Sequence, residues 1–265
     1  MKIKRKNIFT SIGKIAVYIK GKTLNETPVI FLHGVYFDHK LWKNHIHSIN
    51  DRTVITIDMP LHGKSQEDVK NGWDLEDCAQ MLVDILNNLE IPKVIAVGHS
   101  WGSMTILRAA SKYPERFASI GLCNMPFQAT SQKQKILQHL QHALLLFRNF
   151  YTKQAAKALF AKTSLKENPS LLEQLKRPMN LLSNEQIREI DQTVILKPTD
   201  SSDLIQALKV KAYAINGKED FVSTSLYLET IIVNGGHISP LENPNEVSNL
   251  ITKLIKYCTL ELIPA

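Results

Sequence analysis

The chain has 265 residues, of which 44% are hydrophobic and 22% charged, and its formal net charge is +7. This length and apolar content suit one large α/β domain with an insertion. The positive charge does not indicate nucleic-acid binding, because no segment resembles a nucleic-acid recognition motif. No apolar stretch is long enough to span a membrane. The three cysteines have no repeated spacing, which indicates reduced thiols and predicts a cytoplasmic protein.

The first half of the chain alternates predicted strands and helices. Polar and apolar residues alternate from Ile8 to Ile19 around Gly13, which predicts an edge hairpin. The alternation that follows predicts a mostly parallel, doubly wound sheet with helices on both faces. Its predicted elements are strands near 29–33, 54–57, 93–97 and 118–123, and helices near 40–49, 75–90 and 102–112.

The segment 93–102 carries the most informative motif. A β-prone apolar run ends in Gly98-His99-Ser100-Trp101-Gly102, and a helix-prone segment follows. G-x-S-x-G between a strand and a helix is typical of a nucleophile elbow, in which a tight turn exposes the serine hydroxyl. The residues that flank the serine must be small, and the N-terminus of the helix offers N–H groups to an oxyanion. The alternative is a serine in an ordinary turn.

Residues 127–208 lose the strand pattern. The segment lies between two predicted core strands, which predicts a helical cap over the active site. We therefore expect three parts: residues 1–126 and 209–265 form the core, and residues 127–208 form the cap. The helical stripe at the start of the cap consists of Ile136, Leu140, Ala143, Leu144 and Phe147.

The first half of this cap is strongly basic. Residues 127–166 contain seven Lys or Arg residues and no Asp or Glu. The simplest interpretation is a set of solvent-exposed helix faces. The alternative is a docking surface for an acidic partner or substrate. The seven residues are Lys133, Lys135, Arg148, Lys153, Lys157, Lys162 and Lys166.

Two predicted strands after the cap end in residues that suit catalysis. The apolar run from Lys211 leads through Gly217 to Glu219 and Asp220, and the run 230–233 leads to His237. A carboxylate and a histidine at the ends of neighbouring strands of one sheet can both reach a serine at the end of a third. Glu219 is the alternative acid, but its side chain points the other way in an extended chain.

Five segments, in this order, carry a resemblance to a known family: the His33-Gly34 loop, residues 58–65 (DMPLHGKS), the Ser100 elbow, residues 217–220 and residues 235–237. The chain resembles the α/β-hydrolase superfamily, and within it the small bacterial esterase, lactonase and perhydrolase-like branch. The resemblance implies the α/β-hydrolase fold with an inserted helical cap. It departs from the family in one place, because only 16 residues separate Asp220 from His237, where relatives carry a fuller helix.

The resemblance also implies roles for individual residues. Ser100 is the expected nucleophile, Asp220 the acid and His237 the base, and the backbone N–H groups of Val35 and Trp101 are the expected oxyanion hole. These roles agree with the chemistry, since a serine hydroxyl needs a base and a histidine needs a group that fixes its tautomer. The expected reaction is cleavage of a carboxylic ester, thioester or lactone through an acyl-enzyme.

The expected substrate is a small ester with a largely apolar acyl group, and no cofactor or metal is expected. The residues expected to surround this substrate are His33, Tyr36, Phe37, His99 and Phe127. Two alternatives stay open. In one, the basic cap docks an acidic carrier protein whose acyl methyl ester is the substrate. In the other, the chain is a catalytically silent receptor or scaffold on the same fold.

Overall fold

The computed structural model describes residues 3–21 and 26–261 of the chain. Its sheet has eight strands in the order β1-β2-β4-β3-β5-β6-β7-β8. The pairs β1–β2 and β2–β4 are antiparallel, and every other neighbouring pair is parallel, which confirms the mostly parallel sheet. The strands are β1 (Lys4–Phe9), β2 (Lys14–Lys20), β3 (Val29–Leu32), β4 (Val54–Ile57), β5 (Val94–His99), β6 (Phe117–Cys123), β7 (Ala212–Gly217) and β8 (Thr230–Val233).

The predicted hairpin forms one edge of this sheet. Strands β1 and β2 pair from Lys4 opposite Ile19 to Phe9 opposite Lys14. The turn between them passes through Gly13, whose φ of 138° is a conformation that side-chain-bearing residues rarely adopt. The local sequence alone was therefore enough to predict this element.

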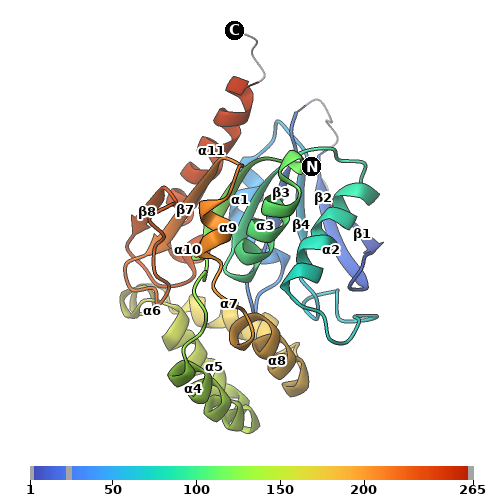
Figure 1. Cartoon of the computed structure of the whole chain (residues 1–265). Coiled ribbons are helices and arrows are strands. Elements are labelled where there is room, and N and C mark those ends of the chain that lie inside the picture. Colours follow the sequence, from blue (N-terminus) through green and yellow to red (C-terminus); the bar gives the residue numbers. More distant parts are fainter. Residues whose placement is uncertain (1–2, 22–25, 262–265) are drawn as a thin grey trace.

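Helices cover both faces of the sheet (Figure 1). Helices α2 (Leu75–Asn88) and α3 (Trp101–Lys112) pack against each other on one face. Helices α1 (Lys43–Ser48) and α11 (Pro244–Glu261) contact each other on the opposite face. The predicted helix near 40–49 begins as a short 3-10 helix, His39–Trp42, before α1.

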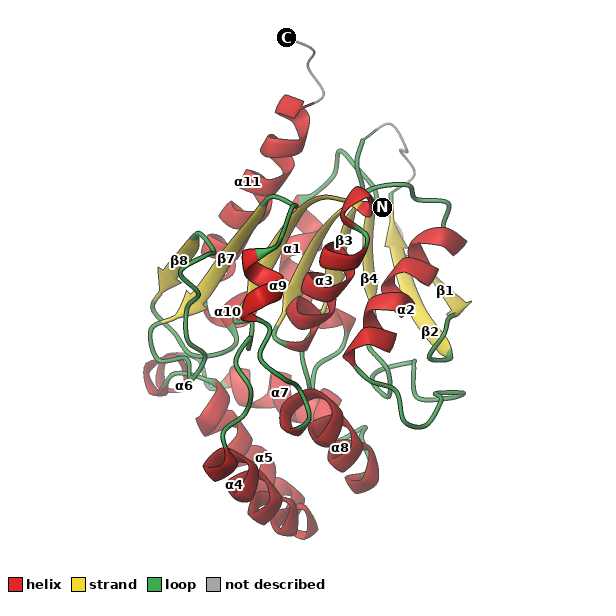
Figure 2. Cartoon of the chain, viewed as in Figure 1, coloured by secondary structure: helices red, strands yellow, loops and turns green. Residues whose placement is uncertain are grey.

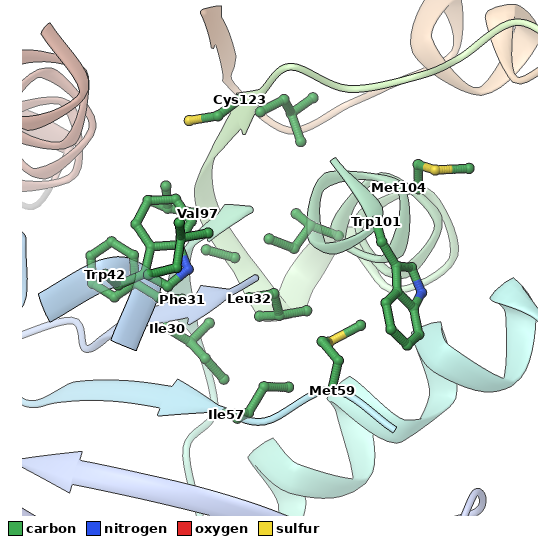
Figure 3. Packing of buried hydrophobic residues seen from close by; sticks show 14 of the residues in the cluster. Ile30, Phe31, Leu32, Trp42, Ile57, Met59, Val97, Trp101, Met104 and Cys123 are labelled. Carbon is green, nitrogen blue, oxygen red and sulfur yellow. The ribbon is translucent and has the colours of Figure 1, made fainter. Parts of the chain in front are cut away.

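The central strands are buried on both faces, so they are continuously apolar instead of alternating. Ile30, Phe31 and Leu32 of β3 are fully buried, as is Val97 of the neighbouring β5. Figure 3 shows these side chains together with Trp42, the last residue of the 3-10 helix, and Met59, which lies two residues after β4. Burial of each such side chain stabilises the fold by about 1.5–3 kcal/mol. This packing makes the sheet a rigid support for the loops at its carboxyl edge.

The segment between β6 and β7 contains helices joined by loops and no strand (Figure 2). Five of its α-helices lie beyond one end of the sheet and form a roof over that end (Figure 1). A sixth, α9 (Ser202–Gln206), packs instead against α3. The roof helices are α4 (Gln132–Ala143), α5 (Arg148–Leu159), α6 (Lys162–Glu167), α7 (Ser170–Met179) and α8 (Asn184–Asp191).

The described stretch from β7 to β8, residues 218–229, contains no helix. The helix that relatives carry between Asp220 and His237 is therefore absent from this stretch. After β8 the chain passes through His237 into the short helix α10 (Ser239–Glu242) and then α11. No helix within residues 3–21 and 26–261 combines the length and apolar character that a membrane span needs.

Candidate active site

Ser100 lies in the turn between β5 and α3, as the elbow motif predicts. Its φ of 50° and ψ of −111° are strained for a residue with a side chain. A Cβ atom on Gly98 would lie 2.4 Å from the backbone nitrogen of Ser103, and one on Gly102 would lie 2.3 Å from the carbonyl oxygen of Leu32. Only glycine fits at either position, because the strand and the helix pass too closely for a side chain.

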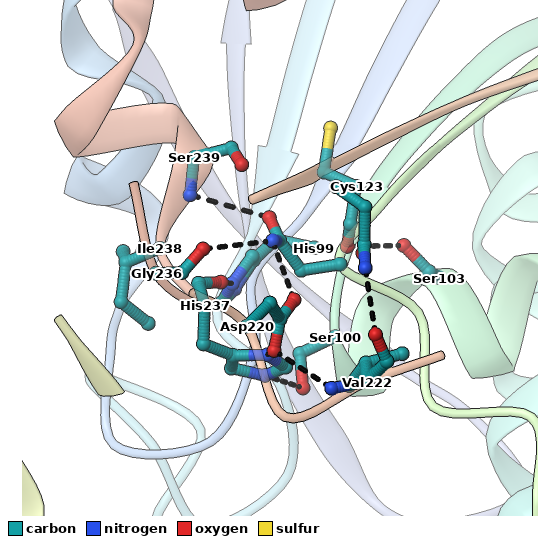
Figure 4. A network of polar contacts seen from close by, with 12 residues as sticks. His99, Ser100, Ser103, Cys123, Asp220, Val222, Gly236, His237, Ile238 and Ser239 are labelled. Carbon is teal, nitrogen blue, oxygen red and sulfur yellow. Dashed lines mark hydrogen bonds and ion pairs between the residues drawn. The ribbon is translucent and has the colours of Figure 1, made fainter. Parts of the chain in front are cut away.

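His237 lies between Ser100 and Asp220 (Figure 4). Its Nε2 atom is 2.9 Å from Ser100 Oγ, and its Nδ1 atom is 2.9 Å from Asp220 Oδ1. The three residues follow the carboxyl ends of β5, β7 and β8, which lie at the same edge of the sheet. Asp220 reaches His237 without an intervening helix, so the short connection is compatible with this arrangement.

The Asp220 carboxylate is buried and fully hydrogen-bonded. It accepts hydrogen bonds from His237 Nδ1, from Asn124 Nδ2 at 2.8 Å and from the Val222 N–H at 3.1 Å. Burial alone raises the pKa of Asp220, but the charge of His237 and these hydrogen bonds outweigh it and hold the pKa below the ordinary value. An ionised Asp220 keeps the proton on His237 Nδ1, which leaves Nε2 to accept the Ser100 proton.

Two further residues position this group, and the sequence motifs did not identify them. Asn124, which follows β6, bonds Asp220 and also accepts a hydrogen bond from the Ser239 N–H at 3.2 Å. The Glu242 carboxylate accepts hydrogen bonds from the N–H groups of Gly236 at 3.0 Å and Ile238 at 3.1 Å, on either side of His237. The end of β6 at the same sheet edge was a signal for Asn124, whereas nothing in the local sequence marks Glu242.

Among the described residues, no acceptor pairs with the backbone N–H of Val35 or of Trp101, the residue after Ser100. Trp101 is the first residue of α3, so its N–H has no acceptor within the helix. The structure gives the Val35 N–H no acceptor among the described residues, and Val35 lines the same cavity as Ser100. Both groups are therefore free to bind an oxyanion.

Two buried histidines hold the loop that carries Val35. His33 Nε2 accepts a hydrogen bond from the Met59 N–H at 2.9 Å, and His62 Nε2 accepts one from the Tyr36 N–H at 3.0 Å. Burial lowers the pKa of His33 to about 4 and that of His62 to about 3. Both rings are thus neutral at physiological pH and can act as acceptors. The bond to His62 holds the backbone of Tyr36, whose φ is 65°.

A cavity of about 240 Å³ contains Ser100 and His237 in its wall. Among the five residues expected to surround a substrate, only Tyr36 lines it. The other four do not line this cavity and pack elsewhere. His33 and His99 are buried and hydrogen-bonded to backbone atoms, Phe37 packs edge-on against His99, and Phe127 lines a separate small cavity.

The apolar stripe predicted at the start of the cap is divided between the cavity and the solvent. Leu144 lines the cavity. Ile136, Leu140 and Phe147 are 62%, 65% and 69% exposed. The stripe predicted the helix α4 correctly, but periodicity along one helix does not show what that helix packs against.

Within the described chain, no group of three or more His, Cys, Asp or Glu side chains is arranged to hold a metal ion.

Comparison with known proteins places the chain in a family. The family model of the alpha/beta hydrolase fold matches residues 27–219, and the chain belongs to this family. In sequence, the chain is 35% identical over 97 residues to a dihydrolipoyllysine-residue acetyltransferase component of the acetoin cleaving system of Pseudomonas putida. That match covers 36% of this chain and 26% of the relative, so the chain spans well under half of the curated relative it matches.

Solved structures share the fold over nearly the whole chain. A thermophilic esterase from Thermogutta terrifontis superposes with a TM-score of 0.78 at 21% identity, covering 96% of this chain and 99% of the esterase. The enol-lactonase from Burkholderia xenovorans LB400 superposes with a TM-score of 0.79 at 16% identity, covering 92% and 96% of the two chains. At these identities the similarity shows the fold.

Proposed function

We propose that the protein is a serine hydrolase that cleaves carboxylic esters or lactones, and by the same chemistry thioesters, through an acyl-enzyme. The observation that carries this proposal is the position of His237, 2.9 Å from both Ser100 Oγ and Asp220 Oδ1. The fold neighbours that are an esterase and an enol-lactonase support the same class of reaction.

In the proposed reaction, His237 Nε2 takes the Ser100 proton while Oγ attacks the substrate carbonyl carbon. The resulting oxyanion accepts hydrogen bonds from the Val35 and Trp101 N–H groups, each worth about 3 kcal/mol in the transition state. His237 then gives its proton to the departing alkoxide, which leaves the acyl group on Ser100. Water, deprotonated by His237, attacks this ester, and the acid departs as Ser100 regains its proton.

The test combines covalent labelling with hydrolysis. A fluorophosphonate should label the wild-type protein at Ser100, and p-nitrophenyl esters of graded acyl length, a lactone and an acyl thioester should be assayed as substrates. Ser100→Ala should abolish labelling and lower kcat by about 10⁴-fold or more, and adding His237→Ala should cost little further, because triad members act as a unit. Ser111→Ala, at the other end of α3, is the matched control.

A mutant that kept more than a few per cent of wild-type activity would show that Ser100 is not the nucleophile. A wild-type protein that is neither labelled nor active on any of these substrates would support the alternative of a catalytically silent receptor or scaffold. Asp220→Asn should lower kcat less than Ser100→Ala or His237→Ala does. A larger loss of kcat in Glu219→Gln than in Asp220→Asn would assign the role of the acid to Glu219.

A second candidate substrate is an acyl methyl ester held by an acidic carrier protein. The observation that favours it is the basic surface of the cap, which carries six lysines without an acidic partner among the described residues. Exposed apolar side chains, including Ile136 and Leu140, lie on the same helices. The six lysines are Lys133, Lys135, Lys153, Lys157, Lys162 and Lys166.

Salt dependence distinguishes this candidate from a small free ester. Docking through several charges weakens steeply once the screening length falls to about 10 Å at 0.1 M salt, whereas hydrolysis of a neutral ester should barely change. Replacement of Lys133, Lys135, Lys153 and Lys157 by Ala should remove the salt dependence for the carrier substrate only. Lys4 and Lys6, replaced together, are the control. If hydrolysis of both substrates depended on salt in the same way, the lysines would be only solvent-exposed residues of the helices and not a docking surface.

A further inference from the structure

The cavity beside Ser100 has a neutral wall that is rich in hydrogen-bonding groups. Its apolar part includes Val35, Met104 and Leu159. No Lys, Arg, Asp or Glu is among the described residues that line it. The remaining wall carries five amide side chains from α4, from α5 and from the segment before α4. These are Gln128, Gln134, Gln138, Gln141 and Gln154.

Helix α4 presents three amides to the cavity and leaves its large apolar residues mostly exposed, although Leu137 also lines the cavity. Gln134, Gln138 and Gln141 are spaced i, i+4 and i+7, so they lie on one helix face. On the other side Ile136 and Leu140 are 62% and 65% exposed, and α4 has no fully buried residue. A surface helix ordinarily turns its apolar stripe inward. Departures from that pattern concentrate at functional sites.

Three of the five amides make no hydrogen bond within the described chain, namely Gln128, which is exposed, and Gln141 and Gln154. Gln141 and Gln154 are partly buried in the cavity wall, and their side chains make no hydrogen bond within the described chain. Neither amide is fully buried, so each can still be solvated when the cavity holds no ligand. A ligand that covered them without hydrogen-bonding them would bury polar groups without partners, which costs about 1–3 kcal/mol. A ligand that supplies hydrogen bonds to them avoids this cost, whereas an alkyl chain does not.

The two other amides on α4 are oriented by their neighbours. Gln138 Nε2 donates to Asp191 Oδ2 at 2.8 Å. A carboxylate can only accept, so the Gln138 carbonyl oxygen remains as a free acceptor. Gln134 Oε1 accepts hydrogen bonds from the Ser131 backbone N–H and hydroxyl, which leaves the Gln134 NH₂ as a free donor. The wall thus offers both kinds of hydrogen bond and no counter-ion.

From this geometry we infer that the cavity selects substrates whose acyl or alcohol part carries a neutral group that both donates and accepts hydrogen bonds, which is an amide or a hydroxyl. Gln141 and Gln154 bind this group, and the apolar wall holds the rest of the chain. A charged substituent is excluded, because no residue in the wall can pair with it. This inference rests on the proposed hydrolysis at Ser100.

The test compares esters of equal length that differ in one polar group. The reference is p-nitrophenyl nonanoate, and the partners are p-nitrophenyl esters in which an amide replaces two chain atoms at successive positions. A parallel series carries a hydroxyl, and a last ester carries a terminal ammonium. The measured quantity is the ratio of kcat/KM for the polar ester to kcat/KM for the alkyl ester.

Gln141→Met and Gln154→Met keep the side-chain length and remove the hydrogen bonds. Each should lower the ratio by about 5-fold for at least one amide or hydroxyl position, because kcat/KM for the polar ester depends on the lost hydrogen bonds and kcat/KM for the alkyl ester does not. Gln132→Met is the matched control, because Gln132 is exposed on the same helix and does not line the cavity. Thermal unfolding confirms that each variant is folded.

The inference is overturned if both variants keep the wild-type ratio for every position of the polar group. It is also overturned if the ammonium ester is the best substrate. Either result would occur with normal hydrolysis and normal labelling of Ser100, so it is distinguishable from failure of the proposed function. That failure would appear as loss of labelling and of hydrolysis for every ester.

Discussion

Glu242 should be essential for holding His237, although it does not touch the substrate cavity. Its carboxylate accepts hydrogen bonds from the N–H groups of Gly236, Ile238 and Ala161, the last at 2.9 Å. It therefore ties the two residues beside His237 to the turn between α5 and α6. Glu242→Gln keeps the size of the side chain but replaces one accepting oxygen with an NH₂ group, which faces a backbone N–H.

The magnitude follows from the contacts. A hydrogen bond to a charged group contributes about 1.5–3 kcal/mol. The amide can keep the two bonds to Oε1 and loses the one from Ile238, so Glu242→Gln should lower the free energy of unfolding by about 2 kcal/mol. For a chain of this size, that corresponds to a fall in Tm of about 5 °C. A shift of His237 by a fraction of an ångström should also lower kcat by about 10-fold or more.

The assay measures Tm by calorimetry and kcat and KM with a p-nitrophenyl ester. KM should change little, because Glu242 does not line the cavity. Glu246→Gln, an exposed carboxylate in the first turn of α11, is the control and should leave both measurements unchanged. If Glu242→Gln had a lower Tm and the wild-type kcat, the hydrogen bonds of Glu242 would stabilise the loop around His237 without positioning the His237 side chain.

Two further predictions concern the framework around the site. Gly102→Ala should prevent folding or yield a protein without labelling at Ser100, because the added Cβ would lie 2.3 Å from the Leu32 carbonyl oxygen; soluble, active protein at wild-type yield would contradict this. For Asp58, burial alone raises the pKa, but the hydrogen bond and charge of His39 bring it down to about 2, below its ordinary value of 3.8. Its ionised form therefore stabilises the protein above pH 4 by about 2 kcal/mol, and this contribution should fall by about half at pH 3. Chemical unfolding of the wild type and Asp58→Asn across this range measures it, and a constant difference would refute it.

The features that depend on local chemistry can be predicted from the sequence. Gly98 and Gly102 around Ser100 predict the elbow, because the steric limits of the turn act on adjacent residues. The continuous apolar runs of β3 and β5 predict buried parallel strands, because both of their faces are covered. Asp220 and His237 were proposed as partners of Ser100 from their order and from their places after predicted strands.

The residues around the site depend on how distant parts of the chain pack together. The solvent-facing position of Ile136 and the cavity-facing position of Gln141 depend on how α4 docks, which its own periodicity does not specify. The packing of Phe37 against His99, away from the cavity, likewise depends on loops that are distant in the sequence. The hydrogen bonds of Glu242 join it to Ala161 across 81 positions of the chain. Such contacts are set by the packing of whole elements, so no local pattern of residues can specify them.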